Sequence, residues 1–258
     1  MMGHRFILLC LVTLLATRPA PSAESPLVAA ASDLQFALTE VNRLYAKDYG
    51  TPARISYGSS GNFMRQIRQG APFEVFLSAD EAYVRTLQAA GLTRDAGVIY
   101  AIGRIVIYSA KGSGINADPD LQGLATALQE GRLQHLAIAN PAHAPYGRAA
   151  REALQTAGLW NPIQPLLVLG ENASQAAGFV VSGASETGIL PYSLVQAPAL
   201  RHQGHFALIP ARWHRPLRQR MVLLYHAGPQ AEAFYRLMQT GPARAIMTKY
   251  GFTLPVAN

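Results

Sequence analysis

The 258-residue sequence predicts an α/β protein of two lobes, each a mostly parallel sheet flanked by helices. Short apolar runs alternate along the chain with segments whose apolar residues recur at helical spacing. A glycine follows several of these helical segments, where its left-handed conformation ends a helix at little cost. A long apolar stretch over 98–108 separates two such series and is long enough to leave one lobe and enter another. Strand–helix alternation of this kind implies parallel strands joined by helices.

The first series holds three apolar runs, each followed by a helical pattern. The pairs, strand first, are 27–31 with 34–46, 54–57 with a short helix around 63–67, and 75–77 with a helix through 87. Gly50, Gly70 and Gly91 follow the three helices and are expected to end them.

The second series repeats the pattern after the long strand. Its elements are strand 136–139 with helix 148–157, strand 166–169 with helix 173–181, and strand 188–190. The apolar run 221–225 is expected to return the chain to the first lobe, ahead of helices near 229–248. We therefore expect residues 24–103 to form lobe 1, 104–225 to form lobe 2, and about 226–258 to return to lobe 1.

The start of the chain has the pattern of a secretory signal peptide over residues 1–23. A charged beginning precedes an apolar run over 6–16, and small residues follow at 20–23. The run is too short to span a bilayer, and cleavage is expected near Ser22–Ala23. The single cysteine, Cys10, leaves with the signal, so the exported chain is expected to fold without a disulfide.

The charge pattern argues against nucleic acid as a partner. The chain has 22 Lys and Arg against 15 Asp and Glu, and loss of the signal peptide leaves 20 basic residues and a net charge near +5. These residues are scattered, without a basic stripe or a nucleic-acid-binding motif. The only dense cluster is Arg212, Arg215, Arg218 and Arg220. We interpret it as a solvated loop, with a weak field that attracts anions as the functional alternative.

Four strand-to-helix junctions are rich in small and polar residues. They lie at 29–35, 58–62, 140–147 and 170–175, two in each series. Ligands of open α/β sheets gather beyond the carboxyl ends of the strands, where helix N-termini present unpaired N–H groups and partial positive charge. Several such ends facing one cleft make an anion site that needs no Lys or Arg. A single serine before a helix is more often only an N-cap, so the hypothesis depends on the recurrence of four junctions.

The junctions and their flanks also carry recognisable motifs. They are Ala29-Ala-Ala-Ser-Asp-Leu-Gln35, Tyr57-Gly-Ser-Ser-Gly-Asn-Phe63, Gln69-Gly-Ala-Pro-Phe-Glu-Val-Phe-Leu-Ser-Ala-Asp80, Ala137-Ile-Ala-Asn-Pro-Ala-His-Ala-Pro-Tyr-Gly147, Gly170-Glu-Asn-Ala-Ser-Gln175 and Lys249-Tyr-Gly-Phe252. In this order they resemble the periplasmic molybdate-binding proteins of ABC transporters. The resemblance implies a type II periplasmic-binding-protein fold that closes on molybdate or tungstate and delivers the anion to a membrane permease. We expect a periplasmic monomer without cofactor or enzymatic activity.

The same resemblance assigns the residues that contact the anion. From the first lobe these are Ser32, Asp33 and Ser60, and from the second lobe Tyr146 and Ala173, which offer backbone N–H groups.

Two positions depart from the family pattern. Pro191 stands where some members carry a tyrosine hydroxyl, and Tyr192 follows one residue later as a candidate contact. Asp33 stands where a neutral residue is frequent, and a carboxylate facing a dianion in a cleft of low dielectric would be repelled. We therefore expect Asp33 to offer its backbone N–H while its carboxylate turns toward a helix end.

Three alternatives stay open. A binding protein for another oxyanion, such as phosphate, sulfate or chromate, would share the fold. A serine hydrolase is a weaker alternative, because Gly58-Ser-Ser-Gly61 lacks the Gly-x-Ser-x-Gly spacing and no spacing joins His143 to a triad. A metal site at His202, His205 and His214 lacks a matching ligand pattern.

Overall fold

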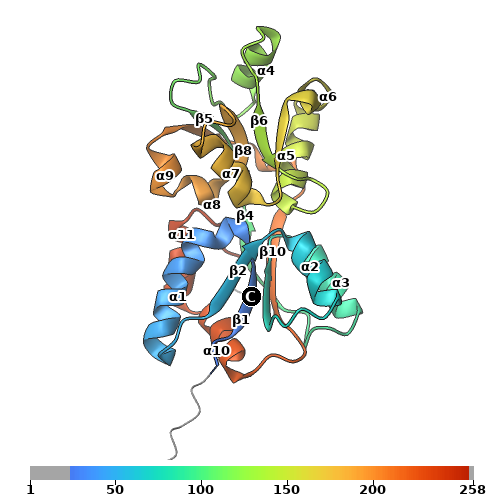
Figure 1. Cartoon of the computed structure of the whole chain (residues 1–258), viewed down its shortest axis with the longest axis vertical. Coiled ribbons are helices and arrows are strands. Elements are labelled where there is room, and N and C mark those ends of the chain that lie inside the picture. The colour runs from blue at the N-terminus through green and yellow to red at the C-terminus, as the bar shows by residue number, and fades with distance from the viewer. Residues whose placement is uncertain (1–23, 256–258) are drawn as a thin grey trace, which may run out of the picture.

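The computed structural model describes residues 24–255, so the expected signal peptide and its cleavage site lie outside the described residues. Two five-stranded sheets, each flanked by helices, form two lobes that are stacked along the long axis of the molecule (Figure 1). The two-lobed α/β architecture predicted from the sequence is confirmed. None of the described helices is long and apolar enough to cross a membrane.

The first lobe contains a sheet in the order β2-β1-β3-β10-β4. Its strands are β1 (Leu27–Ala31), β2 (Arg54–Gly58), β3 (Val75–Ser78), β4 (Val98–Gly103) and β10 (Leu217–Leu223). Its helices are η1 (Ser32–Leu34), α1 (Gln35–Tyr49), α2 (Ser60–Arg68), α3 (Glu81–Ala89), α10 (Pro229–Leu237) and α11 (Gly241–Lys249). Gly50 ends α1 in the left-handed conformation, at φ 82°, as the sequence predicted.

The second lobe contains a sheet in the order β7-β6-β8-β5-β9. Its strands are β5 (Ile105–Ala110), β6 (Leu136–Ala139), β7 (Leu167–Gly170), β8 (Thr187–Pro191) and β9 (Gly204–Leu208). Its helices are α4 (Gln122–Gln129), α5 (Pro145–Thr156), α6 (Trp160–Ile163), η2 (Gln164–Leu166), α7 (Ala173–Val181), α8 (Tyr192–Val195), α9 (Pro198–Arg201) and η3 (Ala211–Trp213).

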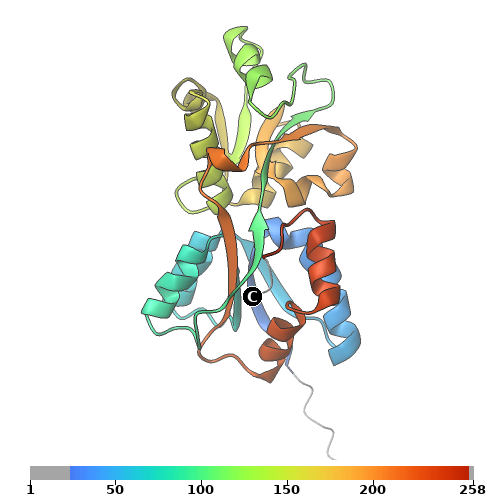
Figure 2. The same ribbon diagram turned by 180° about the vertical axis from the view of Figure 1, so that it is seen from behind.

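The chain crosses between the lobes twice. Each crossing fixes the direction of the strand that follows it relative to the cleft. The first runs from β4 into β5 through Arg104, and the second from β9 to β10 (Figure 2). In each sheet four strands run one way and one runs against them, namely β10 in lobe 1 and β5 in lobe 2. These two strands enter their lobes from the cleft. The other strands therefore run toward the cleft, and their carboxyl ends face it from both sides.

The chain returns to lobe 1 earlier than the sequence indicated. Strand β10 pairs with β3 and β4, with Met221 opposite Leu77 and Leu217 opposite Gly103. The expected return at about residue 226 is therefore too late. Exposed Arg218 alternates here with buried neighbours, and this polar pattern hid the first half of the strand.

Two arginines of the cluster, Arg218 and Arg220, lie on a strand and not on the solvated loop that the sequence indicated. Arg218 and Arg220 project from β10 and pair with Glu81 at 2.9 and 3.2 Å. Arg215 pairs with Glu152 at 2.8 Å. These acidic partners are shared, because Glu81 also pairs with Arg85 and Glu152 also pairs with Arg148. The cluster is therefore held by ion pairs but keeps a net positive charge.

The C-terminal helices pack into the core of lobe 1. Phe234 of α10 is fully buried, and its ring meets Tyr45 of α1 edge-on at 5.4 Å between centroids. The Tyr45 hydroxyl donates to the Gln230 side-chain oxygen at 2.8 Å. The return of the chain thus closes one face of the first sheet.

Replacing Phe234 with alanine should lower the free energy of unfolding by about 3–5 kcal/mol, because the change leaves a cavity beside Tyr45. Tyr225 is the matched control, since it is 75% exposed, and Tyr225→Ala should change stability by less than about 0.5 kcal/mol. Urea unfolding followed by circular dichroism measures both. Equal, small effects would show that α10 is not part of the lobe 1 core.

Candidate functional site

A small cavity lies between the lobes where the four polar junctions meet. Both lobes line it, through Ala31, Ser32, Asp33, Gly58, Ser59, Ser60 and Ala79 from lobe 1 and Ala144, Pro145, Tyr146 and Ala173 from lobe 2. Its volume is about 10 Å³, close to that needed by one water molecule. Because both lobes form its walls, the cavity belongs to a closed arrangement of the protein.

Helix N-termini from both lobes converge on this cavity. Ser32 begins η1, Ser60 begins α2, Pro145 begins α5 and Ala173 begins α7. The first N–H groups of a helix have no partner within it, and the helix end carries about half a positive charge. None of the lining residues is Lys or Arg. The cavity can therefore hold an anion through neutral donors and helix dipoles.

Five of the six residues expected at the site line this one cavity: Ser32, Asp33, Ser60, Tyr146 and Ala173. Tyr192 does not line it. Its backbone N–H donates to the Arg104 carbonyl at 2.9 Å, and its ring lies against Phe206, 5.8 Å between centroids. A Cβ on Gly251 would come within 2.5 Å of the same ring. Tyr192 thus packs near the crossing, against Phe206 and the C-terminal segment at Gly251.

The Asp33 carboxylate is buried at the junction of the lobes, and its residue is 2% exposed. Its Oδ2 accepts hydrogen bonds from the Tyr146 hydroxyl at 2.9 Å and the Gln219 amide at 2.7 Å. The Tyr100 hydroxyl donates to the other end of the Gln219 amide at 2.7 Å. These side-chain partners lie on α5 and β10, whereas we expected the carboxylate to turn toward a helix end. Burial raises the pKa of Asp33 to about 6, and hydrogen bonds from Gln219, Tyr146 and the backbone N–H of Asp33 itself oppose the rise.

Polar contacts close the lobes around the cavity. Sequence reasoning did not find them, because each joins residues far apart in the chain. They are the Gly61 N–H to the His143 carbonyl at 3.0 Å, the Ser174 N–H to Ser32 Oγ at 3.2 Å, the Ser193 hydroxyl to the Asp33 carbonyl at 2.8 Å, and Arg148 to Asp80 at 3.0 Å. Each pair has one residue in either lobe, so these contacts hold the lobes together.

A serine, a histidine and a carboxylate come together beside the cavity. Ser59 Oγ lies 2.9 Å from His143 Nδ1, and His143 Nε2 lies 3.5 Å from Glu171. A catalytic triad needs a nucleophile that substrate can reach. Ser59 is only 4% exposed and faces a space of about 10 Å³, and opening the lobes separates it from His143. The contact therefore joins the lobes, and it would be lost in an open form that admits a ligand.

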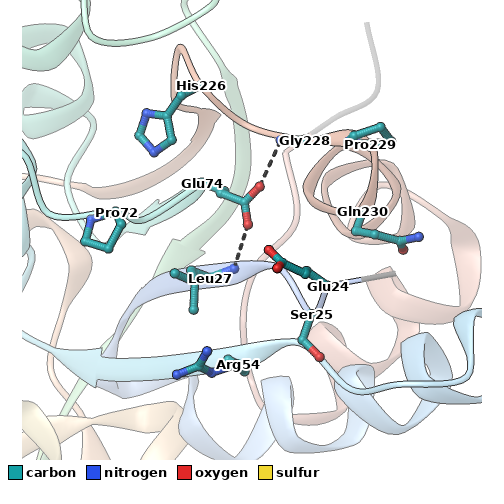
Figure 3. Close-up of a pocket in the computed structure, with 10 residues that line it drawn as sticks. All are labelled: Glu24, Ser25, Leu27, Arg54, Pro72, Glu74, His226, Gly228, Pro229 and Gln230. Carbon is teal, nitrogen blue, oxygen red and sulfur yellow. Dashed lines mark hydrogen bonds between the residues drawn. The ribbon is translucent and has the colours of Figure 1, made fainter. Parts of the chain in front are cut away.

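A larger cavity, of about 900 Å³, lies at the far end of lobe 1 (Figure 3). Within it the Glu74 carboxylate accepts hydrogen bonds from the N–H groups of Leu27 at 3.0 Å and Gly228 at 2.8 Å. Leu27 and Arg54, which both line the cavity, are the first residues of β1 and β2. The cavity thus lies at the amino ends of the parallel strands, and one helix, α10, begins at its wall with Pro229. Four helices from both lobes begin at the smaller cavity, so the larger volume does not identify the anion site.

The three histidines weighed as a metal site show no such arrangement. The His214 Nδ1 atom lies 2.9 Å from the Arg215 carbonyl, and burial lowers the pKa of His214. His205 lies on β9 and is exposed. Among residues 24–255, no group of three or more His, Cys, Asp or Glu side chains is placed to hold a metal ion.

Comparison with known proteins agrees with this architecture. A family model described as bacterial extracellular solute-binding protein matches residues 26–253. The chain belongs to this family. The molybdate-binding protein ModA of Rhodobacter capsulatus is 34% identical over 236 residues, 90% of either chain. ModA of Azotobacter vinelandii is 34% identical over 230 residues, 88% of this chain and 89% of the relative.

Solved structures show the same fold for this solute-binding protein. The periplasmic molybdate-binding protein of Azotobacter vinelandii has a TM-score of 0.80 at 32% identity, covering 90% of this chain and 100% of that one. The sulfate-binding protein SubI of Mycobacterium tuberculosis H37Rv has a TM-score of 0.74 at 14% identity, over 90% of this chain and 87% of that one. The second likeness concerns the fold alone. The resemblance to molybdate-binding proteins that the motifs indicated is confirmed.

The role of lobe closure in anion binding can be tested at Gly61, because a substitution there removes no side-chain hydrogen-bond donor. A Cβ there would lie 2.7 Å from the His143 carbonyl oxygen across the cleft, so Gly61→Ala should hold the lobes apart. We expect affinity for molybdate, the anion named for the relatives, to fall at least about tenfold, or ~1.4 kcal/mol. Calorimetric titration measures the affinity, and small-angle X-ray scattering measures the closure.

Gly178→Ala is the matched control, because a Cβ at this exposed position of α7 meets no atom within 4 Å. It should bind like the parent and gain up to about 1 kcal/mol of stability. Full closure and unchanged affinity in Gly61→Ala would show that the contact between Gly61 and His143 is dispensable.

Proposed function

We propose that this protein captures molybdate or tungstate between its lobes in the periplasm and delivers it to the membrane permease of an ABC importer. It acts by binding, not by catalysis. The observation that carries the proposal is the convergence of helix N-termini from both lobes on one enclosed cavity without a basic residue. Relatives named as molybdate-binding proteins over about nine-tenths of the chain support the choice of anion.

The serine hydroxyls of the site are oriented to donate. Ser60 Oγ accepts a hydrogen bond from the Ala79 N–H at 2.9 Å, and Ser32 Oγ accepts one from the Ser174 N–H at 3.2 Å. Since each oxygen already accepts from the backbone, its own hydrogen is free to point to an anion. With the N–H groups of Tyr146 and Ala173, the site offers donors from both lobes to a tetrahedral dianion.

Entry of the anion requires the lobes to part, because the closed cavity is about the size of one water molecule. The two crossings, at Arg104 and between β9 and β10, are where the lobes can turn relative to one another. An anion that donors of both lobes hold binds the closed form better than the open one. Binding therefore shifts the population toward closure, and the permease would engage this closed form.

A second candidate function is the binding of another tetrahedral oxyanion, such as phosphate, sulfate or chromate. The observation that favours phosphate is the buried Asp33 carboxylate, whose Oδ1 has no hydrogen-bond partner in the described part of the chain. Phosphate near neutral pH still carries a proton, and a buried acceptor would receive it. Molybdate is an unprotonated dianion at the same pH and has no proton to give.

Calorimetric titration of the exported chain with molybdate, tungstate, sulfate and phosphate separates the two candidates. We expect molybdate and tungstate to bind at least about 100-fold more tightly than sulfate or phosphate, a difference of ~2.7 kcal/mol. Tight binding of phosphate or sulfate with weak binding of molybdate would contradict the proposal and leave the fold assignment standing.

Ser60→Ala should lower molybdate affinity about 10- to 150-fold, because it removes one charge-assisted hydrogen bond worth about 1.5–3 kcal/mol. Ser182→Ala is the control, since Ser182 is exposed just after α7 and bonds only within its own helical turn. Titration and thermal melting are measured for both variants. If Ser60→Ala melts lower but binds as tightly as the parent, Ser60 serves only to hold the Ala79 loop.

A further inference from the structure

Among the described residues that line the cavity between the lobes, Asp33 is the only acidic one. Its two carboxylate oxygens differ in environment. Oδ2 accepts from Tyr146 and Gln219, whereas Oδ1 is fully buried and has no partner among residues 24–255. A buried acceptor without a hydrogen bond is unfavourable. A fully deprotonated dianion has no proton to donate to this oxygen, so binding such an anion leaves it unpaired.

Among residues 24–255, no cationic side chain is paired with Asp33. The groups that face the carboxylate are the Tyr146 hydroxyl on α5 and the neutral Gln219 amide on β10, with Tyr100 on β4 beyond them. Burial raises the pKa of both tyrosines well above 10, so both stay neutral. Within the described chain, Asp33 has no hydrogen bond or ion pair with a Lys, Arg or His side chain.

Burial already holds the pKa of Asp33 at about 6, above its ordinary value of 3.8. A doubly charged anion in the same small cavity adds like-charge repulsion, which favours the neutral carboxyl further. The anion therefore raises the pKa of Asp33 further. Binding thus moves this carboxyl toward its neutral form.

We propose that Asp33 takes up one proton from solvent when a fully deprotonated dianion such as molybdate binds, so that the site holds a neutral carboxyl group beside the anion. The proton stays on Asp33, and no bond to the anion forms or breaks. This inference rests on the proposed function and deepens it, since it makes Asp33 a residue that selects anions by protonation state. Hydrogen phosphate would bring its own proton for the charged carboxylate to accept, and its binding would take up none.

The sign of the pH dependence follows from these two states. Below the pKa of Asp33 in the free protein, the carboxyl is neutral before and after binding, and affinity is flat. Between that pKa and the higher pKa of the complex, binding consumes a proton, so affinity for molybdate falls about tenfold per pH unit. Over pH 6.5 to 8.5 we expect a loss of up to about 100-fold.

Isothermal calorimetry with molybdate over this pH range tests the inference. Titration at pH 7.5 in two buffers of different ionisation enthalpy counts the protons, and we expect an uptake approaching one per anion. Asp33→Asn should bind with pH-independent affinity, within about tenfold of the parent at pH 6.5 and tighter than the parent at pH 8.5. Asp48→Asn makes the same change of net charge at an exposed position near the end of α1 and should keep the pH dependence of the parent.

Molybdate binding by the parent without proton uptake would overturn the inference while the proposed function stands. A pH slope that persists in Asp33→Asn would also overturn it. Absence of molybdate binding at every pH would overturn the proposed function itself. The buffer comparison uses the parent protein alone, so the inference stays falsifiable even if Asp33→Asn does not fold.

Discussion

Strand direction at the cleft is the constraint on which the rest of the structure depends. A strand that enters a lobe through the cleft must run away from it, and β5 and β10 both do so. The remaining strands of each sheet run toward the cleft, and the helix after each of β1, β2, β6 and β7 begins there. The two crossings thus aim helix N-termini from both lobes at one space, and the backbone alone makes that space attractive to an anion.

Closure of this space depends on polar contacts of modest strength. Hydrogen bonds between Ser32 and Ser174 and between Gly61 and His143 cross the cleft, and each contributes only about 1 kcal/mol net. The ion pair of Arg148 with Asp80 is reinforced by Glu152, whose carboxylate also binds Arg148 at 3.1 Å. Buried apolar residues of both lobes also belong to one continuous cluster, with Leu34 on one side and Ala173 on the other. A bound anion that contacts both lobes can therefore shift the balance between open and closed forms.

The spacing of apolar residues was sufficient to predict most helices and strands. Glycines after helices and clusters of small polar residues marked the four junctions, because both are visible within a short stretch of sequence. The helix predicted over 173–181 matches α7, and five of six expected site residues line one cavity. Strand β10 was recognised only in part, since exposed Arg218 interrupts its apolar run.

The hydrogen bonds that cross the cleft could not be predicted from one sequence. The contact of Asp33 with Gln219 joins residues 186 positions apart, and that of Ser193 with Asp33 joins residues 160 apart. Tyr192 was misplaced for a similar reason. Its neighbours Phe206 and Gly251 come from other segments, and spacing within a motif carries no information about them.

The most direct measurement of the central claim is the position of molybdenum in crystals grown with molybdate, located by anomalous scattering at its absorption edge. We expect one strong peak between the lobes. The anion oxygens should lie within hydrogen-bonding distance of Ser32 and Ser60 on one side and of the N–H groups of Tyr146 and Ala173 on the other. A peak beside the β10 arginines, in the far cavity of lobe 1, or in contact with one lobe only would contradict it.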